Sequence, residues 1–518
     1  MTAVNDYDAI VVGGGHNGLV CAAYLARGGL RTLLLEARAE VGGTAASESF
    51  AGATVNICNC DHITFRTTPV IEELGLVNHG LKYLDLEPAQ INMSWGADGN
   101  VGPAWASYHS VEQTLDSIGR NYPGEVDGYR RYLKAAIPAV RLLFESANDP
   151  PTLGGLTRKV LARGGRGVST LLRWNRRSAA DVMREYFTAD ALQGPGMLVG
   201  PMVWGISPEL PRTGLGALTY ALRHVGKVGR PVGGSGEVPR TLRAAFELAG
   251  GATRVRTKVS AVTCEGAGVR GVVLADGSEI TARIVVSACN PHDTFLSWLR
   301  NPPPQAANLV RRWQAIPHDD GYESKIDAVM SAVPHLRAAR DAGLDGDLTA
   351  SYAIAPTLAD MHRAFEIMPS GGVIERPGII ANVPSVGDPS VAPSGQHVLS
   401  LETVFTPYGF KGGWAGSAEP ERWLDLFGGL AEPGFKQSLI EWRAMTPDRY
   451  EREFYLPHGH ATSFAGGPLA ALHNKNPELT RYETPVEGLY ITGAATFPGA
   501  GVWGASGRNA AIKILSQQ

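Results

Sequence analysis

The first forty residues alternate between short apolar runs and one glycine-rich break. Residues 8–12 are almost continuously apolar, which is typical of a parallel strand buried on both faces. The pattern predicts a helix over residues 19–27, ended by Gly28 and Gly29, and a second buried strand over residues 32–35. A strand–helix–strand unit of this kind indicates an α/β fold with a parallel sheet.

The break between the first strand and the helix has the spacing G-x-G-x-x-G, at Gly13, Gly15 and Gly18. Gly13 permits the tight turn, Gly15 lets backbone approach a pyrophosphate, and Gly18 lets the helix pack on the strand. The helix N-terminus, with His16 and Asn17, offers free N–H groups and a positive dipole to phosphates. The motif therefore predicts a dinucleotide-binding Rossmann unit.

Glu36 follows the second strand, where a carboxylate can accept both hydroxyls of an adenosine ribose. The same carboxylate would repel a 2′-phosphate, so NADP is disfavoured at this site. A purely structural glycine turn is the alternative, but strand, helix, second strand and acid all fall in register. The motif alone does not separate NAD from FAD.

Two further segments bear on the cofactor. The first carries the doublet Gly42-Gly43 followed by Thr44, and the second is a glycine-rich stretch over residues 488–511. Together with the first motif they resemble the phytoene desaturase and carotenoid isomerase-like family of FAD-dependent oxidoreductases. The likeness is closest to its branch named pyridine nucleotide-disulfide oxidoreductase domain-containing protein 2. It is strong at both chain ends, fair over residues 231–290 and thin elsewhere.

The resemblance implies FAD as the cofactor. In the family the glycine doublet lies along the pyrophosphate and ribityl chain, and the residue matching Val259 packs by the adenine. Many relatives carry arginine where this chain has Thr44, so other donors must meet the pyrophosphate charge. No Cys or His occurs between residues 488 and 507, which predicts non-covalent binding. The predicted cofactor-binding residues are Gly13, Gly15, His16, Asn17, Gly18, Glu36, Ala37, Arg38, Gly42, Gly43, Thr44, Val259, Gly493, Ala494, Gly501 and Val502.

The C-terminal stretch predicts a strand over residues 489–492, a Pro/Gly turn and a helix over about 502–515. A helix N-terminus at the pyrimidine edge of the flavin would stabilise negative charge on the reduced ring. An ordinary amphipathic helix after a loop is the alternative.

Because the resemblance returns the chain to the cofactor domain over residues 231–290, that domain is expected to be discontinuous. We predict a Rossmann-type FAD-binding domain from residues 1–80, 228–300 and 476–518. An inserted mixed α+β substrate domain takes residues 81–227 and 301–475. Its first part is predicted to be helical over residues 111–146. The apolar run over residues 192–206 either lines a lipophilic cavity or forms plain core.

Four residues are candidate acid–base groups, namely Asp61, His62, His458 and His460. Asp61 and His62 follow the glycine doublet, in a stretch that passes the ring in related flavoenzymes. They either exchange a proton with substrate or form a buried hydrogen-bonded pair. His458 and His460 precede the last predicted strand and are expected to face the flavin from the substrate side. No metal is expected, because zinc needs three or four converging ligands.

Charge and cysteine content narrow the choice of partners. Lys and Arg number 47 against 50 Asp and Glu, so nucleic acid is not an expected partner. Five cysteines and no long apolar stretch favour a cytoplasmic protein. Residues 156–177 are a candidate for peripheral membrane contact, and a solvated basic face or a protein contact is the alternative. Their basic residues are Arg158, Lys159, Arg163, Arg166, Arg173, Arg176 and Arg177.

The predicted function is FAD-dependent oxidoreduction of the dehydrogenase or desaturase type. The protein would remove hydride from an apolar, isoprenoid or lipid-like small molecule, with a quinone or O2 as electron acceptor. Three alternatives stay open: an amine oxidase-like flavoenzyme, a redox-neutral flavin isomerase, and a non-catalytic membrane or assembly partner.

Overall fold

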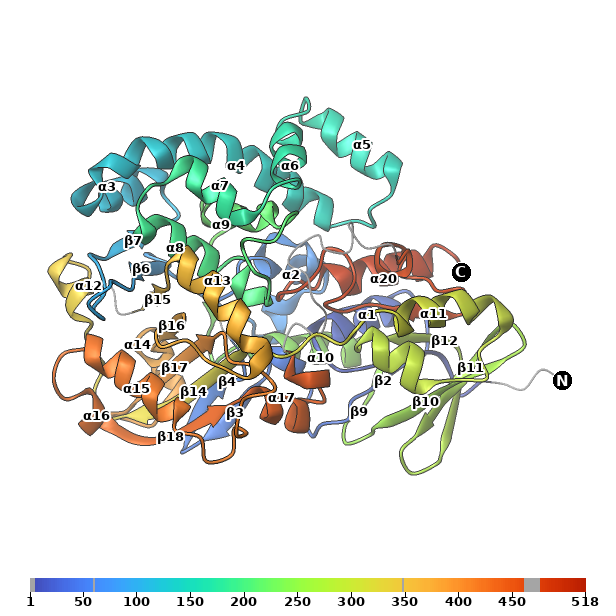
Figure 1. The fold of residues 1–518 in the computed structure, drawn as a ribbon. Helices are drawn as coiled ribbons and strands as arrows, with labels where there is room; N and C mark the ends of the chain where they lie inside the picture. Colours follow the sequence, from blue (N-terminus) through green and yellow to red (C-terminus); the bar gives the residue numbers. More distant parts are fainter. Residues whose placement is uncertain (1–4, 59–60, 347–348, 461–475) are drawn as a thin grey trace.

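The computed structural model describes residues 5–58, 61–346, 349–460 and 476–518, and two large sheets organise this part of the chain (Figure 1). The first sheet has the strand order β13-β10-β11-β12-β1-β2-β9, with β19 beside β12. β1 pairs in parallel with β2 and β12, and β12 also pairs in parallel with β19. Its strands are β1 (Tyr7–Val12), β2 (Thr32–Leu35), β9 (Ala252–Arg254), β10 (Val259–Glu265), β11 (Gly268–Leu274), β12 (Glu279–Ser287), β13 (Leu299–Arg300) and β19 (Leu489–Ile491).

The second sheet has the order β18-β14-β17-β16-β15-β6-β7 and is antiparallel except between β15 and β6. Its strands are β6 (Gln90–Ser94), β7 (Trp105–Ser107), β14 (Glu323–Met330), β15 (Ser351–Ala355), β16 (Ile379–Asn382), β17 (His397–Val404) and β18 (Leu439–Met445). Two smaller antiparallel pairs are β3 (Ser47–Phe50) with β4 (Ala53–Asn56), and β5 (Tyr83–Asp85) with β8 (Gly229–Pro231). Mixed sheets with helices around them confirm the predicted α/β class.

Helices α1 (His16–Arg27) and α10 (Glu237–Leu248) contact strands of the first sheet, and α20 (Ala505–Leu515) packs on α1. α1 begins three residues earlier than predicted, because Gly15 is extended and ends the strand-to-helix turn. α20 begins later than predicted, because Gly504 has a φ of 72°. A Cβ on Gly507 would lie 2.1 Å from the carbonyl oxygen of Asn17, so α1 and α20 approach closely.

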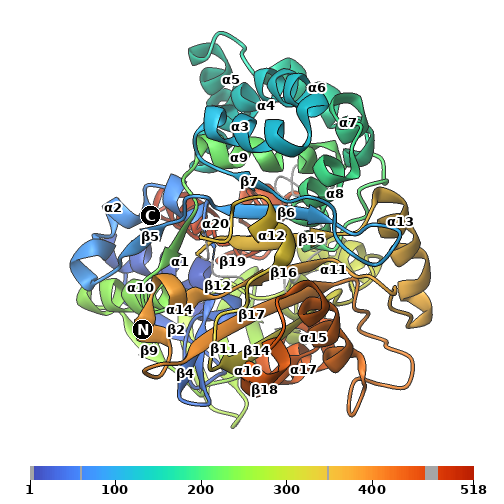
Figure 2. The ribbon, with the colours of Figure 1, turned by 90° about the vertical axis from the view of Figure 1, so that its left-hand side faces the viewer.

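A helical layer lies above the second sheet in Figures 1 and 2. It comprises α3 (Val111–Asn121), α4 (Val126–Ala147), α5 (Leu153–Ala162), α6 (Val168–Trp174), α7 (Ala179–Tyr186), α8 (Asp190–Leu198) and α9 (Thr219–Val225). The region predicted as one helix is two, because a turn beginning at Pro123 separates α3 from α4. Buried aromatic rings join the helices of this layer, as where Tyr132 stacks on Trp174 at 5.7 Å.

The other helices in the described part of the chain mostly flank the second sheet (Figure 2). They are α2 (Val70–Glu73), α11 (Ala307–Gln314), α12 (Arg337–Asp341), α13 (Leu358–Ile367), α14 (Pro384–Gly387), α15 (Glu419–Leu430), α16 (Phe435–Ser438), α17 (Pro447–Phe454) and α19 (Glu478–Arg481). Within the described residues, no helix combines the length and apolarity that crossing a bilayer requires.

Candidate active site

The glycine turn between β1 and α1 is tightly packed where the helix meets the strand and has free space next to Gly15. Gly13 has a φ of 103°, which favours glycine. A Cβ on Gly18 would lie 2.0 Å from the Gly13 carbonyl oxygen, so strand and helix touch at this point. A Cβ on Gly15 would meet nothing within 4 Å, and no side chain caps α1. The first N–H groups of the helix therefore face an open space that suits an anion.

The Glu36 carboxylate is fixed beside this turn. Its Oε2 accepts the N–H of Gly14 at 2.7 Å, and its Oε1 accepts the N–H of Arg38 at 2.8 Å. Each oxygen keeps a second lone pair, so the group can still accept hydroxyl donors. The N–H of Thr257 donates to the Glu36 carbonyl at 2.8 Å, and this brings the buried Val259 of β10 to the same region.

The glycine doublet packs directly against the turn. The N–H of Gly42 donates to the Gly14 carbonyl at 2.8 Å, and a Cβ on Gly42 would lie 2.9 Å from that of Ala46. Gly43 has a φ of 57° and begins a 3₁₀ turn that includes Thr44. The half-buried Ala37 lies between Glu36 and Arg38 in this chain segment.

Arg38 is held in place but incompletely hydrogen-bonded. Its guanidinium lies 3.8 Å from the ring centroid of Phe454, and Nη2 donates to Glu48 Oε1 at 2.5 Å. Nη1 is buried and has no hydrogen-bond partner among the described residues. A pyrophosphate bound here would supply the acceptor that Arg38 and the first N–H groups of α1 lack. The residues of this region therefore fit FAD, even with threonine at position 44.

The C-terminal segment joins the same site. The N–H of Gly493, which has a φ of 116°, donates to Ser506 Oγ at 3.1 Å. Asn17 of α1 is buried, and its Oδ1 accepts the N–H of Gly507 at 3.4 Å. Gly501 has a φ of 107° and lies in contact with His16, whose pKa burial lowers to about 4.

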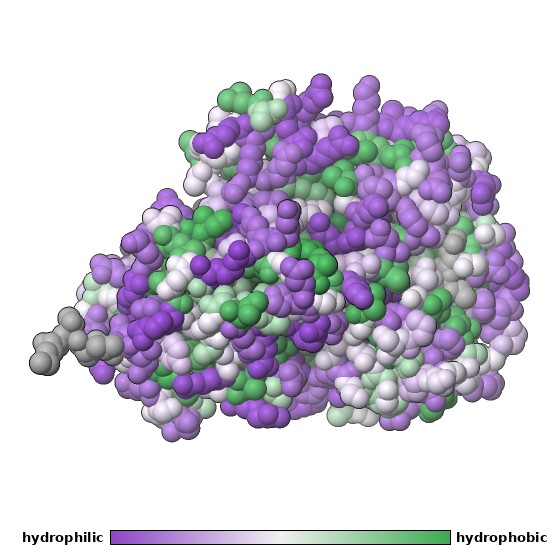
Figure 3. Space-filling view, turned by 180° about the vertical axis from the view of Figure 1, so that it is seen from behind, coloured by the Kyte–Doolittle hydropathy of each residue, from purple (hydrophilic) through white to green (hydrophobic). Residues whose placement is uncertain are grey.

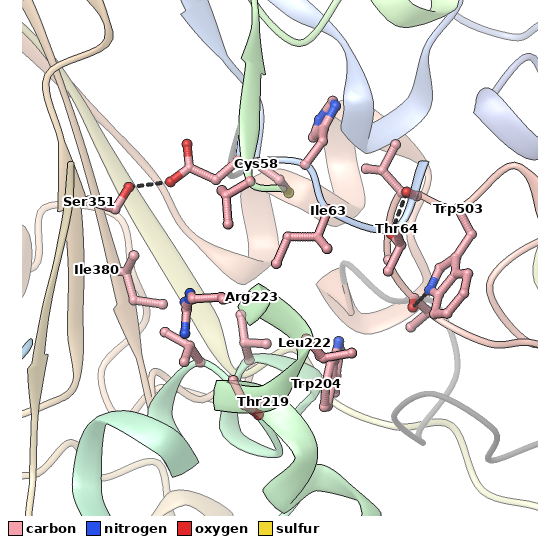
Figure 4. A pocket seen from close by; sticks show the side chains of 18 of the residues that line it. Cys58, Ile63, Thr64, Trp204, Thr219, Leu222, Arg223, Ser351, Ile380 and Trp503 are labelled. Atoms are coloured by element: carbon pink, nitrogen blue, oxygen red, sulfur yellow. Dashed lines mark hydrogen bonds between the residues drawn. The ribbon is translucent and has the colours of Figure 1, made fainter. Parts of the chain in front are cut away.

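A cavity of about 290 Å³ lies where the two sheets and the helical layer meet (Figure 4). Five predicted cofactor-binding residues line it: His16, Thr44, Ala494, Gly501 and Val502. The opposite wall is largely apolar, and its aliphatic and aromatic members include Ile63, Leu143, Val199, Val203, Trp204, Leu215, Leu218, Leu222, Val228 and Ile380. From the apolar run over residues 192–206, Trp204 lines the cavity whereas Met197 and Met202 are fully buried core.

Asp61 and His62 also line the cavity, and each side chain is hydrogen-bonded to different residues. One Asp61 oxygen accepts from Arg230 Nε at 2.9 Å and Nη2 at 2.7 Å, and the other accepts from Ser351. His62 Nδ1 lies 2.9 Å from the Tyr83 hydroxyl and Nε2 lies 3.0 Å from that of Ser235. Burial lowers the pKa of His62 to about 3. Proton uptake by His62 near neutral pH is therefore unfavourable.

The structure places the second pair of predicted acid–base groups apart from this wall. His458 Nδ1 lies 2.7 Å from Asp320 Oδ1, and its ring stacks on Tyr408 at 5.0 Å. His460 is buried, and its ring meets Tyr322 edge-on at 5.3 Å. Neither histidine is among the described residues that line the cavity.

Sequence reasoning missed two buried carboxyl groups in the cavity wall. Glu323 of β14 and Glu402 of β17 share a side-chain hydrogen bond, and the Cys58 thiol lies 3.8 Å from Glu323 Oε1. Burial raises the pKa of Glu323 well above its usual range and that of Glu402 to about 7. Glu402 Oε1 has no hydrogen-bond partner among the described residues. Glu402 is thus poised to exchange a proton near neutral pH.

A signal for Glu323 was present in β14. Its charged residues Glu323, Lys325 and Asp327 alternate with other residues, which places all three on one face of a strand. Every residue of the strand is buried. Charges repeated on one face of a fully buried strand point to a polar site, because isolated buried charges are costly.

Comparisons with known proteins agree with this geometry. Residues 11–74 match the NAD(P)-binding Rossmann-like domain model, and residues 174–318 match the model for flavin containing amine oxidoreductase. The rat pyridine nucleotide-disulfide oxidoreductase domain-containing protein 2 (Rattus norvegicus) is 29% identical, over 98% of this chain and 93% of its own length. The neurosporene-forming phytoene desaturase of Rhodobacter capsulatus is 24% identical, over 95% of this chain and 91% of its own.

Among solved structures, cyclohexylamine oxidase from Brevibacterium oxydans superposes with a TM-score of 0.60 at 16% identity, covering 99% of each chain. At that identity the likeness shows the fold alone. It confirms a Rossmann-like FAD-binding unit combined with a second mixed sheet. Taken with the open glycine turn and the domain-model matches, these findings indicate an FAD-dependent oxidoreductase with FAD bound non-covalently, similar to the rat protein and to phytoene desaturase.

Proposed function

We propose that this enzyme is a dehydrogenase that removes hydride from a largely apolar substrate held in the cavity. The observation that carries the proposal is the cavity wall itself. Residues assigned to the cofactor, such as His16 and Gly501, share the cavity with a wall in which most side chains are aliphatic or aromatic. A relative named for phytoene, which is a hydrocarbon, supports an apolar substrate.

The proposed cofactor contacts follow the geometry of the turn. Gly13, Gly15 and Gly18 with the start of α1 would hold the pyrophosphate, and Arg38 would supply a cation to it. Glu36 would accept the ribose hydroxyls. When bound, FAD supplies the hydride acceptor. The remaining proposed contacts are the ribityl side with Gly42, Gly43 and Thr44, the adenine side with Val259, and the ring side with Gly493, Ala494, Gly501 and Val502.

The proton is proposed to leave through Glu402. As the substrate C–H bond breaks with loss of hydride, the neighbouring atom must lose a proton for the new double bond to form. The Glu402 carboxylate lines the cavity and has an unpartnered oxygen, and its raised pKa favours uptake. Asp61 and His62, with their hydrogen bonds occupied, would position the wall rather than take this proton.

Substrate-driven reduction of the bound flavin under anaerobic conditions tests this function, and the loss of flavin colour measures the rate of reduction. We expect an apolar alkene or hydroaromatic compound to bleach the flavin, and Glu402→Gln to slow bleaching by about 100-fold. Glu441→Gln, at an exposed position of β18, is the matched control and should leave the rate unchanged. Bleaching by primary amines only would instead support the amine oxidase-like alternative. Isomerisation that requires pre-reduced flavin would support the isomerase.

The two sheets support the proposed domain division. The strands of the first sheet come from residues 1–80, 228–300 and 476–518, and those of the second from 81–227 and 301–475. The pair β5 and β8 bridges the proposed boundary. Proteolysis at the proposed junctions, near residues 80, 228, 300 and 476, would test the division.

We also propose that α5 and α6 contact an anionic membrane surface. Leu153, Leu161 and Leu172 are exposed, and the projecting upper part of the molecule shows apolar beside hydrophilic side chains (Figure 3). Lys159, Arg163, Arg173 and Arg177 form ion pairs with acidic neighbours. The structure gives no ion pair to Arg158, Arg166 or Arg176 among the described residues, so these three are the basic groups offered to a surface.

Sedimentation with vesicles checks the membrane contact. We expect binding to vesicles that contain phosphatidylserine, and a loss of at least about tenfold when Arg158, Arg166 and Arg176 are all changed to serine. Vesicles of phosphatidylcholine alone are the control. Equal binding by the wild-type and triple-serine proteins would leave the segment as a solvated basic face.

A further inference from the structure

One wall of the cavity carries a buried guanidinium whose hydrogen bonding is incomplete. Arg223 of α9 is 9% exposed, and its Nη2 donates to Gln90 Oε1. Its Nε and Nη1 are buried and have no hydrogen-bond partner among the described residues. A buried cation with open N–H donors is costly unless something completes its contacts.

The acidic groups of the cavity form no hydrogen bond with this guanidinium among the described residues. Asp61, the carboxylate that attracts Arg223, is itself hydrogen-bonded by Arg230 and Ser351. Burial raises the pKa of Glu323 well above its usual range and that of Glu402 to about 7, which favours the uncharged form of both carboxyls. Arg223 lines the cavity, and an anion bound there would supply the acceptors that its Nε and Nη1 lack.

We infer that the cavity binds a substrate with an apolar body and a carboxylate end, and that Arg223 binds the carboxylate. This inference rests on the proposed function, because it assigns the head group of the same substrate. Figure 4 places Arg223 near Ile380, and Leu222 and Trp204 also line the cavity. Arg223 would then determine specificity by distinguishing an apolar acid from a hydrocarbon of the same shape.

Ligand binding to the FAD-loaded enzyme tests the inference with two probes of equal length, octanoate and octanamide. Their dissociation constants are measured from the change in the flavin absorbance spectrum and, independently, from the rise in Tm. In the wild type we expect octanoate to bind at least about tenfold more tightly, since charge-assisted hydrogen bonds replace neutral ones. In Arg223→Met that preference should disappear while octanamide binding stays within about threefold.

Two further variants keep the test interpretable. Arg223→Lys retains the charge without the planar guanidinium and should show an intermediate preference. Arg130→Met, at an exposed position of α4 paired with Asp127, is the control and should behave as wild type. If Arg223→Met does not fold, the wild-type preference and its reduction in Arg223→Lys decide the question.

The outcomes separate the inference from the function on which it rests. Equal binding of octanoate and octanamide by the wild type would overturn the carboxylate assignment and leave the apolar cavity intact. A preference that persists in Arg223→Met would also overturn it, because another cation would then bind the acid. Failure of both probes to bind would overturn the proposed apolar substrate site itself, and the inference with it.

Discussion

The cofactor turn and the far wall of the cavity reach their geometry by different routes. Gly13, Gly15, Gly18 and Glu36 belong to one strand–helix–strand unit, so local chain geometry brings them together. Arg223, Glu323 and Glu402 come from α9, β14 and β17, and only the folded arrangement of both sheets and the helical layer makes them neighbours of one cavity. A local site tolerates little change in backbone shape. In a site assembled from distant elements, the properties of the side chains are set instead by their burial and by neighbouring charges.

The largest effect is expected where backbone shape is decisive, at Gly18. Because the Cβ of Gly18→Ala would lie 2.0 Å from the Gly13 carbonyl oxygen, helix α1 must shift from β1. We expect a loss of stability of about 3 kcal/mol or more, together with loss of FAD. Thermal unfolding and the flavin content of the purified protein measure the two effects.

Gly15→Ala is the matched control for this change. Its Cβ meets no protein atom within 4 Å, so the fold should be kept. FAD binding should still weaken, because the added methyl group lies in the space assigned to the pyrophosphate. The structure assigns helix packing to Gly18 and the space for the cofactor to Gly15. Equal losses of stability in Gly15→Ala and Gly18→Ala would contradict this assignment.

At the far wall of the cavity, the expected effect is a dependence of stability on pH that is linked to Glu402. Folding raises the pKa of Glu402 from its usual 4.5 to about 7, so the folded protein binds the proton more tightly than the unfolded chain. The stability linked to this proton is complete below about pH 4.5 and is lost as pH rises through about 7. Wild type should therefore lose on the order of 2–3 kcal/mol relative to Glu402→Gln between pH 5 and 8.

Denaturant unfolding at a series of pH values measures this difference. Glu441→Gln, at an exposed position of the same sheet, should follow the wild-type curve throughout. Parallel curves for wild type and Glu402→Gln would mean that Glu402 titrates normally and is not the proton acceptor.

The same contrast explains what the sequence could predict. The turn, its glycine spacing, Glu36 and the α/β class follow from local pattern, and the errors there are small shifts such as the start of α1 at His16. Long-range pairing was harder to predict. Asp61 and His62 do line the cavity, but their partners Arg230 and Ser235 come from a distant segment. No sequence motif includes Arg223. Its proposed role follows from two buried N–H donors that have no hydrogen-bond partner among the described residues of the folded chain.

Removal of the Glu36 carboxylate should have a smaller effect on the cofactor turn than the change at Gly18. Glu36→Ala removes the proposed ribose acceptor and leaves the N–H groups of Gly14 and Arg38 without their partner. We expect FAD binding to weaken by about 1–3 kcal/mol, and equilibrium titration of the apoprotein with FAD measures it. Glu36→Gln keeps one acceptor oxygen and should lose less. Unchanged affinity in Glu36→Ala would contradict the ribose role.

The smallest effect is expected at Gly501, where the cofactor side meets the cavity. Its φ of 107° strains any other residue, and an added Cβ would lie 3.3 Å from the Trp503 ring. Gly501→Ala should therefore cost about 1 kcal/mol of stability. Gly277→Ala is the matched control, because Gly277 has a φ of 87° in a turn where a Cβ meets nothing within 4 Å. Both variants should lose similar stability, but only Gly501→Ala should shift the flavin spectrum, because only Gly501 lines the cavity. An unshifted spectrum in Gly501→Ala would separate this turn from the flavin ring and assign its positive φ to loop geometry alone.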